Sequence, residues 1–233
     1  MPLIALVDYG LEDLSLIETA LNEAGAEVFP SSDPDAIVGA DGIVLYGKAG
    51  FAEAIEAIRE KDLEQHLKAA IVANKPFLGI NVGMHLLYGT GRESTASQLG
   101  ERFVKGINFI VGSCRDLPDV DEYGFDFELP HKGMAPLYRD KRCKTKLLDN
   151  IEDGQEFYYE HSFIAPTGPL VQAWSSYSML FPAAVSFHDH YMGVQFLPEQ
   201  SGEAGMTVLR NFVMICASAD EVEDLKFQLG PAF

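Results

Sequence analysis

The segment that decides the fold of this chain is Pro76-Phe77-Leu78-Gly79-Ile80-Asn81-Val82-Gly83-Met84-His85. An apolar run typical of a buried strand leads directly into a glycine-flanked turn, and a helix is predicted to follow. A strand, a tight turn and a helix with glycine on both sides of one central residue is the design of a nucleophile elbow. We therefore expect a strained turn at Asn81, with small neighbours at Gly79 and Gly83.

Asn81 occupies the centre of this turn, where an elbow enzyme carries a nucleophile. The side chain of the central residue is lifted toward the N-terminus of the following helix, whose dipole stabilises an anion. Serine or cysteine there would attack a substrate, whereas a carboxamide is neutral and offers no useful lone pair. The alternative is a plain strand-to-helix turn in which asparagine tolerates unusual φ and ψ angles.

Around the elbow, the first half of the chain alternates short apolar runs with amphipathic segments, which is typical of βαβ units in a parallel sheet. The predicted strands are Leu3–Asp8, Ala26–Phe29, Gly42–Leu45 and Pro76–Ile80. The predicted helices carry Leu11, Leu14, Ile17 and Leu21 on one face, follow Pro34, and run from Ala52 to about Ala73. Gly25 is expected to end the first helix.

Helical periodicity fades between Arg102 and Phe196, where glycine, proline, aromatics and short β-type runs dominate. We interpret this region as mostly antiparallel strands packed beside the parallel sheet, at Gly106–Val111, Glu156–Ile164, Ala183–Phe187 and Gly193–Phe196. Ser201 is expected to N-cap a closing helix with Glu203 in its first turn. No repeat or linker divides the sequence, so one domain over residues 1–233 is predicted.

The composition argues against several classes of function. The 233 residues are 47% hydrophobic and carry a formal net charge of −18. Binding a nucleic acid needs clustered Lys and Arg, so this acidity argues against such a partner. Cys114, Cys143 and Cys216 form no C-x-x-C pair and are typical of reduced thiols. No signal peptide or membrane-spanning run is predicted, and we expect no membrane association and a cytoplasmic location.

Short segments along nearly the whole chain follow the order and spacing of one family. They are Ile4–Gly10, Ser32–Pro34, Ala40–Leu45, Lys75–Ile80, Pro130-His131, His161-Ser162, Phe181–Val185, Gly193–Phe196, Pro198-Glu199 and Ser201–Gly205. In these segments the sequence resembles the class I glutamine amidotransferases, and specifically the glutaminase subunit of imidazole glycerol phosphate synthase. The resemblance implies a three-layer, flavodoxin-like α/β fold, with a mostly parallel central sheet, helices on both faces and added antiparallel strands.

That family cleaves the side-chain amide of glutamine by thiolate attack, with a His as base and a Glu that orients it. The family's elbow reads G-I-C-x-G-M-Q, so the resemblance puts Asn81 at the nucleophile position. The family's motif Q-F-H-P-E puts Leu197 at the base position and Glu199 at the orienting acid. Nucleophile and base are therefore replaced, and the loss of either costs about 10⁶-fold in turnover. Glu199 is retained, either for chemistry or for a structural role.

The resemblance also implies a pocket beside the elbow, comprising Gly47, Lys48, Ala49, Gly83, His85 and His161. The family's oxyanion strand P-G-V-G corresponds to Tyr46-Gly47-Lys48-Ala49, and the Gln that helps to hold substrate corresponds to His85. Lys48 and Glu199 are expected either to form a salt bridge across the pocket or simply to fill it. His161 matches a position near the glutamine pocket, but it is equally open to the role of an ordinary strand residue.

A partner-facing surface is implied at Asp13, His131, Met134 and Gln200. The family's P-H-x-G loop faces a cyclase, and here it reads Pro130-His131-Lys132-Gly133-Met134, with Met134 where the family usually has Trp. The family's P-E-K becomes Pro198-Glu199-Gln200, and its G-x-G-N-L becomes Gly10-Leu11-Glu12-Asp13-Leu14. The implied partner is a HisF-like TIM-barrel cyclase, although the altered surface leaves open whether it is the ordinary one.

Neither a cofactor nor a metal is predicted. The triplet His188-Asp189-His190 lies in an expected hairpin and contains two metal-ligating residue types. Without a third ligand at suitable spacing, an exposed polar turn is the preferred interpretation.

Three functions remain open at this stage. The first, which is preferred, is an accessory subunit that docks on a TIM-barrel cyclase or related synthase without making ammonia. The partner would then use free ammonia or run a different ring-forming reaction. The second is an enzyme or small-molecule binder with new chemistry in the remodelled pocket, using His85, Lys48 and Glu199. The third is a self-associating binding protein without a synthase partner.

Overall fold

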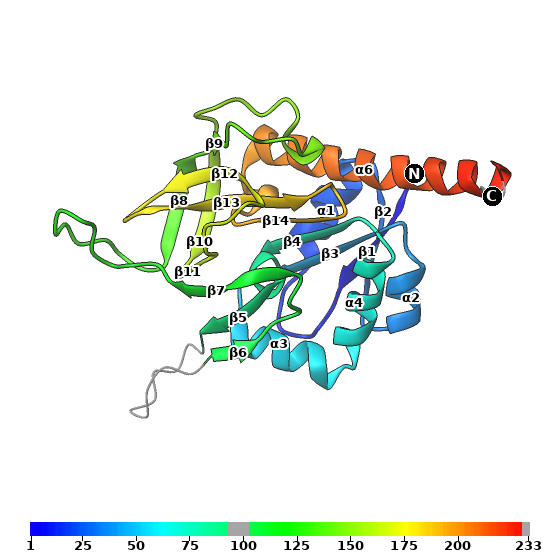
Figure 1. The fold of residues 1–233 in the computed structure, drawn as a ribbon, viewed down its shortest axis with the longest axis horizontal. Helices are drawn as coiled ribbons and strands as arrows, with labels where there is room; N and C mark the ends of the chain where they lie inside the picture. The colour runs from blue at the N-terminus through cyan, green and yellow to red at the C-terminus, as the bar shows by residue number, and fades with distance from the viewer. Residues whose placement is uncertain (93–102, 230–233) are drawn as a thin grey trace.

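A computed structural model describes residues 1–92 and 103–229, and Figure 1 shows a large twisted sheet with helices packed on it. The strands are β1 (Leu3–Val7), β2 (Glu27–Ser31), β3 (Gly42–Gly47), β4 (Phe77–Asn81), β5 (Tyr88–Arg92), β6 (Phe103–Lys105), β7 (Ile110–Asp116), β8 (His131–Pro136), β9 (Tyr138–Arg139), β10 (Glu156–His161), β11 (Phe163–Ile164), β12 (Val171–Ser176), β13 (Leu180–Phe187) and β14 (Tyr191–Val194). The helices are α1 (Ser15–Glu23), α2 (Pro34–Gly39), α3 (Phe51–Glu60), α4 (Leu63–Val72), α5 (Val82–Leu86) and α6 (Gly202–Leu229), with short 3₁₀ turns η1 (Lys146–Leu148) and η2 (Pro198–Gln200).

The central sheet has the strand order β2-β1-β3-β4-β14-β13-β12-β9. The five strands from β2 to β14 run parallel, and β13, β12 and β9 continue the sheet antiparallel. The predicted α/β class with a mostly parallel sheet is confirmed. The antiparallel strands were expected beside this sheet, but these three extend it, because β14 pairs with β4 on one edge and with β13 on the other. Two smaller sheets hold the remaining strands, in the orders β10-β8 and β11-β7-β5-β6.

Side chains alternate between the two faces of the parallel strands, so each face has its own core. Ile4 and Leu6 of β1 pack in one core with Ile17 of α1 and Phe212 of α6. Ala5 and Val7 of the same strand pack in the other core with apolar residues of α2, α3 and α4. The helices therefore cover both faces, which gives the predicted three layers.

Some predicted element boundaries were wrong. The segment from Ala52 to Ala73 forms two helices rather than one, because Asp62 between them has a left-handed backbone with φ of 56°. Helix α1 begins at Ser15, so Leu11 lies before it and is 42% exposed. The Ser201 hydroxyl does not cap α6, because it accepts from the Tyr158 N–H and donates to the Leu197 carbonyl.

The start of the predicted β-rich region and the expected absence of a membrane-spanning helix can be compared with the described residues. Arg102, where the β-rich region was predicted to begin, lies outside the described residues. Within the described part, none of the helices combines the length and the apolar character needed to cross a membrane.

Candidate functional site

The elbow forms where β4 passes directly into α5. Asn81 is the last residue of β4 and has φ of 55° and ψ of −111°, a backbone conformation that is rare and strained for a residue other than glycine. A Cβ at Gly83 would overlap the Leu45 carbonyl oxygen, and one at Gly79 would overlap the Gly83 carbonyl oxygen. Backbone therefore approaches both glycines too closely for any side chain, and the strained turn expected from the sequence is present.

Three parallel strands end together at the elbow. Gly47 at the end of β3 lies opposite Asn81 in the sheet register, and Gln195 follows β14, whose Val194 lies opposite Ile80. The carboxyl ends of parallel strands are where α/β sheets place their binding sites. The fold thus brings together residues from positions 47, 81 and 195.

The side chain of Asn81 is held in a chain of buried hydrogen bonds. Its Nδ2 donates to the Glu160 carbonyl over 2.8 Å, and its Oδ1 accepts from Nε2 of Gln195 over 3.0 Å. Gln195 Oε1 lies 2.7 Å from Nε2 of His85. Because the Gln195 oxygen can only accept, His85 must donate through Nε2. Burial lowers the pKa of His85 to about 4, so this ring is neutral at physiological pH.

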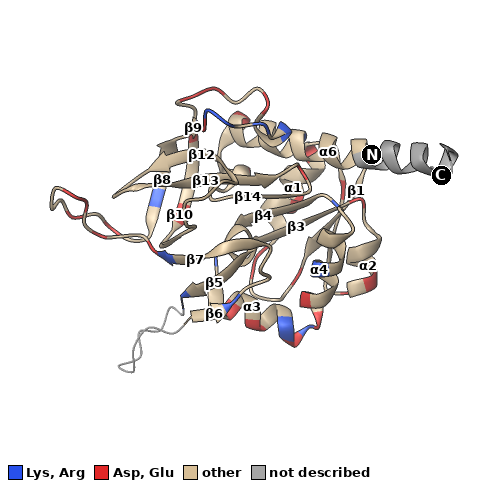
Figure 2. Cartoon of the chain, viewed as in Figure 1, with Lys and Arg blue, Asp and Glu red and all other residues tan. Residues whose placement is uncertain are grey.

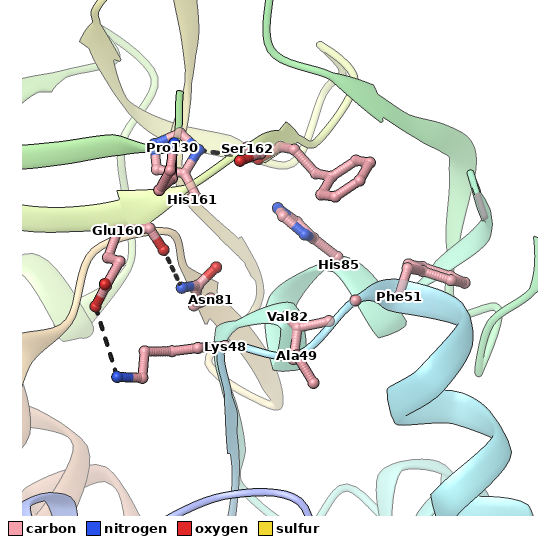
Figure 3. A pocket seen from close by; sticks show the side chains of 12 residues that line it. Lys48, Ala49, Phe51, Asn81, Val82, His85, Pro130, Glu160, His161 and Ser162 are labelled. Carbon is pink, nitrogen blue, oxygen red and sulfur yellow. Dashed lines mark hydrogen bonds and ion pairs between the residues drawn. The ribbon is translucent and has the colours of Figure 1, made fainter. Parts of the chain in front are cut away.

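A pocket of about 340 Å³ opens beside this network (Figure 3). Its lining consists of Lys48, Ala49, Gly50, Phe51, Asn81, Val82, His85, Pro130, Glu160, His161, Ser162 and Phe163. Four of the six residues predicted for the pocket are thus brought together there. Gly47 and Gly83 lie just behind the lining and shape the backbone.

Lys48 pairs with Glu160, and the salt bridge expected with Glu199 is absent. Its Nζ lies 3.5 Å from the Glu160 carboxylate, and a dashed line in Figure 3 marks this ion pair. Lys132 donates to the other oxygen of that carboxylate over 2.9 Å. The hydrogen bond from Lys132, with the charge of Lys48, lowers the pKa of Glu160. Glu160 lies nearer because β10 borders the pocket, whereas Glu199 lies in η2 outside its lining.

In the loop after β3, two backbone N–H groups already donate hydrogen bonds to a side chain of the same protein. Oε1 of Glu12 accepts from the N–H of Lys48 over 2.7 Å and from the N–H of Ala49 over 2.9 Å. The Tyr9 hydroxyl lies 3.1 Å from the same oxygen. Two adjacent N–H groups that could stabilise a developing oxyanion are therefore both bound to a carboxylate of the same chain.

Leu197 and Glu199 are not among the residues that line the pocket. Leu197 is completely buried in the core on the α1 and α6 face. Glu199 Oε1 accepts from the Tyr46 hydroxyl over 3.1 Å. Among the described residues, the second oxygen of Glu199 is buried and has no hydrogen-bond partner. Burial raises the pKa of Glu199 above its ordinary value.

The interface role predicted for the side chain of His131 does not agree with its burial. It is 2% exposed, stacks on Tyr177 with ring centroids 4.0 Å apart, and has its Nδ1 3.2 Å from Nε2 of His161. His161 in turn contacts the Phe163 carbonyl through Nδ1 over 3.0 Å, and burial lowers its pKa to about 3. The ring of His131 is drawn inward because β8 pairs with β10, which sets the two histidines opposite each other.

The other predicted interface residues lie at or near the surface. Met134 is 49% exposed, Asp13 is exposed and Gln200 is partly exposed. In the His188–His190 turn, Asp189 accepts from the Thr145 hydroxyl and from the Lys146 N–H. Within residues 1–92 and 103–229, no three metal-ligating side chains gather at one point.

Sequence reasoning missed three residues that shape the site. Glu160 borders the pocket, Gln195 links Asn81 to His85, and Glu12 occupies the loop donors. Each lies inside a segment noted in the sequence, respectively Glu156–Ile164, Gly193–Phe196 and Gly10–Leu14. In the sequence, the one sign of such a role was that Glu12 stands where the family pattern G-x-G-N-L has its second glycine.

Comparisons with known proteins agree with this architecture. The family model described as Glutamine amidotransferase class-I matches residues 5–216. The imidazole glycerol phosphate synthase subunits HisH of Bacillus cereus (strain G9842) and Escherichia coli (strain K12) are each 34% identical to this chain. The matches cover 90% of this chain, with 93% of the Bacillus protein and 98% of the Escherichia protein.

A solved structure titled as a glutamine amidotransferase shares the fold. It superposes with a TM-score of 0.64 at 11% identity, over 92% of this chain and 98% of that one. Fold, family model and relatives agree, and this chain is a member of the class I glutamine amidotransferase family.

Proposed function

We propose that this chain is a HisH-like subunit that pairs with a HisF-like cyclase and does not hydrolyse glutamine. In this proposal residues 1–233 form one cytoplasmic domain, and the partner closes its ring with free ammonia. The observation that carries the proposal is Asn81 at the centre of the elbow. Its amide is engaged on both sides by Glu160 and Gln195, so the position offers neither a thiol nor a free side chain.

The residues around Asn81 support the same proposal, that the chain does not hydrolyse glutamine. The residue proposed at the base position, Leu197, is an aliphatic core side chain. The buried oxygen of Glu199 without a partner is the kind of orphaned acceptor that a lost histidine would leave. Glu12 occupies the two loop N–H groups that an oxyanion would need.

The test is co-expression with the nearest co-encoded cyclase-like protein, followed by assays of ring formation with glutamine and, separately, with ammonium. We expect the two proteins to co-purify and to turn over ammonium only. Turnover on glutamine would overturn the assignment of Asn81 and Leu197 as lost catalytic positions. Failure of every co-encoded cyclase to bind would overturn the partnership.

A second candidate is a small-molecule function for the pocket itself. It is favoured by the pocket volume of about 340 Å³ and by the polar lining of Lys48, Glu160 and His85. A screen of small amides and amines by thermal shift would give a ligand whose effect disappears in His85→Ala. A stabilising ligand that acts equally on this variant would argue against the pocket.

A further inference from the structure

A concentrated positive segment lies between β9 and η1, away from the elbow. Arg139, Lys141, Arg142, Lys144 and Lys146 fall within eight consecutive residues of a chain that has only 17 lysines and arginines. Figure 2 shows this loop in blue beside β9. In a protein with a net charge of −18, this is a local concentration of positive charge.

The loop borders an open groove of about 540 Å³. Its lining is Arg139, Asp140, Lys141, Arg142 and Trp174. Three cations therefore face one carboxylate, and an indole supplies a flat apolar surface.

Asp140 is used to build the loop. Its carboxylate accepts from the Trp174 indole over 3.0 Å, and from the N–H and Nε of Arg142, both over 2.9 Å. The hydrogen bonds from Arg142 and then from Trp174 lower the pKa of Asp140. The single negative charge in the groove is thereby committed to holding its neighbours.

Backbone contacts fix the same turn. The Asp140 N–H donates to the Gln172 carbonyl over 2.7 Å, and the Cys143 N–H donates to the Asp140 carbonyl over 2.8 Å. The Lys144 N–H donates to the side chain of Gln172 over 3.0 Å. A loop fixed in this way loses little entropy when it binds a ligand.

Donors remain for a ligand after these contacts. A guanidinium carries five N–H groups, and Asp140 engages only Nε and Nη2 of Arg142. Lys141 is exposed and adds a mobile ammonium group at the same edge. Arginine and lysine together are the usual recognition set for phosphate oxygens.

We propose that this groove binds a phosphate-bearing small molecule, with its phosphate on Arg139, Lys141 and Arg142 and the rest of the ligand against Trp174. The site is separate from the elbow pocket and does not depend on the function proposed for the subunit. A small ligand is favoured over a nucleic acid, because the acidic remainder of the surface would repel an extended polyanion.

Trp174 is the one tryptophan of the chain, so fluorescence excited selectively in the indole reports on this groove. Titration with pyrophosphate and with AMP, at constant ionic strength, is expected to give a saturable change. Adenosine, which has no phosphate, is expected to give none. A response to pyrophosphate alone would assign the site to inorganic phosphates, and a stronger response to AMP would assign it to organic ones.

Matched charge variants decide whether the groove is responsible. Lys141→Gln and Arg142→Gln should each raise the Kd for pyrophosphate and AMP by about tenfold, because each removes one charge-assisted hydrogen bond. Lys105→Gln, the same change at an exposed site on β6, should leave affinity unchanged. The proposal fails if neither phosphate ligand binds, if adenosine binds as well as AMP, if Lys141→Gln binds normally, or if an RNA oligonucleotide outcompetes both.

Discussion

The polar side chains at the elbow form hydrogen bonds with one another and with the adjoining loop, so they are not free to bind a substrate. Asn81, Gln195 and His85 form one hydrogen-bonded chain, and Glu12 fills the donors of the adjoining loop. A glutaminase needs these groups to be available when its substrate arrives. Under the proposed function, glutamine hydrolysis should therefore require more than a cysteine at position 81 and a histidine at position 197.

We predict that Asn81→Cys with Leu197→His will hydrolyse glutamine poorly until Glu12→Gly is added. Freeing the N–H groups of Lys48 and Ala49 should raise turnover by about 10²–10³, the usual value of an oxyanion donor. Glutamate release in the cyclase complex measures the effect. Glu12→Gln is the matched control, because its carbonyl oxygen still accepts both bonds, and it should give no gain. Equal rates for the glycine and glutamine variants would contradict the role of Glu12.

The burial of His85 predicts a dependence of stability on pH. Its pKa is lowered from 6.5 to about 4 in the folded state, so the unfolded chain binds the proton first. The contribution of His85 to the free energy of unfolding is therefore complete above about pH 6.5 and decreases as the pH drops toward 4. Between pH 7 and pH 5 the decrease is about 2 kcal/mol. Glu199, whose pKa is raised, acts in the opposite direction, so a variant is needed to separate them.

His85→Gln keeps a donor for Gln195 and removes the titration, so its urea midpoint should fall less between pH 7 and pH 5 than that of the parent. His66→Gln, on α4, serves as the control and should follow the parent. Parallel curves for the parent and His85→Gln would show that His85 does not titrate as described.

The residues of the site were partly readable from the sequence. The sequence identified four residues that line the pocket, because they occupy positions of recognisable motifs: Asn81, His85, Lys48 and His161. Glu160 was missed as the partner of Lys48, because pairing across the pocket depends on how β10 is placed by the smaller β8–β10 sheet. His131 was assigned to the surface for the same reason, since sequence alone does not reveal which way a strand faces.

Among the elements, the β4–α5 elbow depends most strictly on two glycines. Gly83→Ala should cost about 3 kcal/mol or more, because the added Cβ meets the backbone carbonyl of Leu45, which cannot move without disturbing β3. Gly39→Ala, at the end of α2, meets nothing within 4 Å and should stabilise by about 0.5 kcal/mol. Chemical denaturation of both variants checks the contrast, and equal stabilities would contradict the packing described for the elbow.

Elements with strong periodicity were predicted well, and their ends were not. The parallel strands and the elbow carried clear apolar runs, so β1, β3 and β4 were located nearly to the residue. The break between α3 and α4 was missed because Asp62 interrupts the helix by its backbone conformation while the apolar spacing continues. The antiparallel strands join the main sheet through the pairing of β14 with β4, a long-range contact that no local pattern records.

At the scale of the whole molecule, the proposed cyclase interface can be probed through exposed methionines. Met134→Glu on β8 should weaken the complex by at least about tenfold, because a charge would be buried on docking. Met214→Glu on α6 makes the same change at a residue that is 66% exposed and should have no effect. Affinities measured by titration calorimetry compare the two, and equal losses would argue against docking through β8.

The strand order also has a consequence for synthesis of the protein. The neighbours of β4 are β3 on one edge and β14 on the other, and β14 is the last strand within residues 1–92 and 103–229. A ribosome adding 5–20 residues per second needs roughly 6–20 s for the roughly 110 residues between β4 and β14. Throughout that interval the nascent half-sheet exposes the open edge of β4, which is a template for misassembly. Correct folding of this protein therefore depends on keeping one strand edge shielded until the final strand leaves the ribosome.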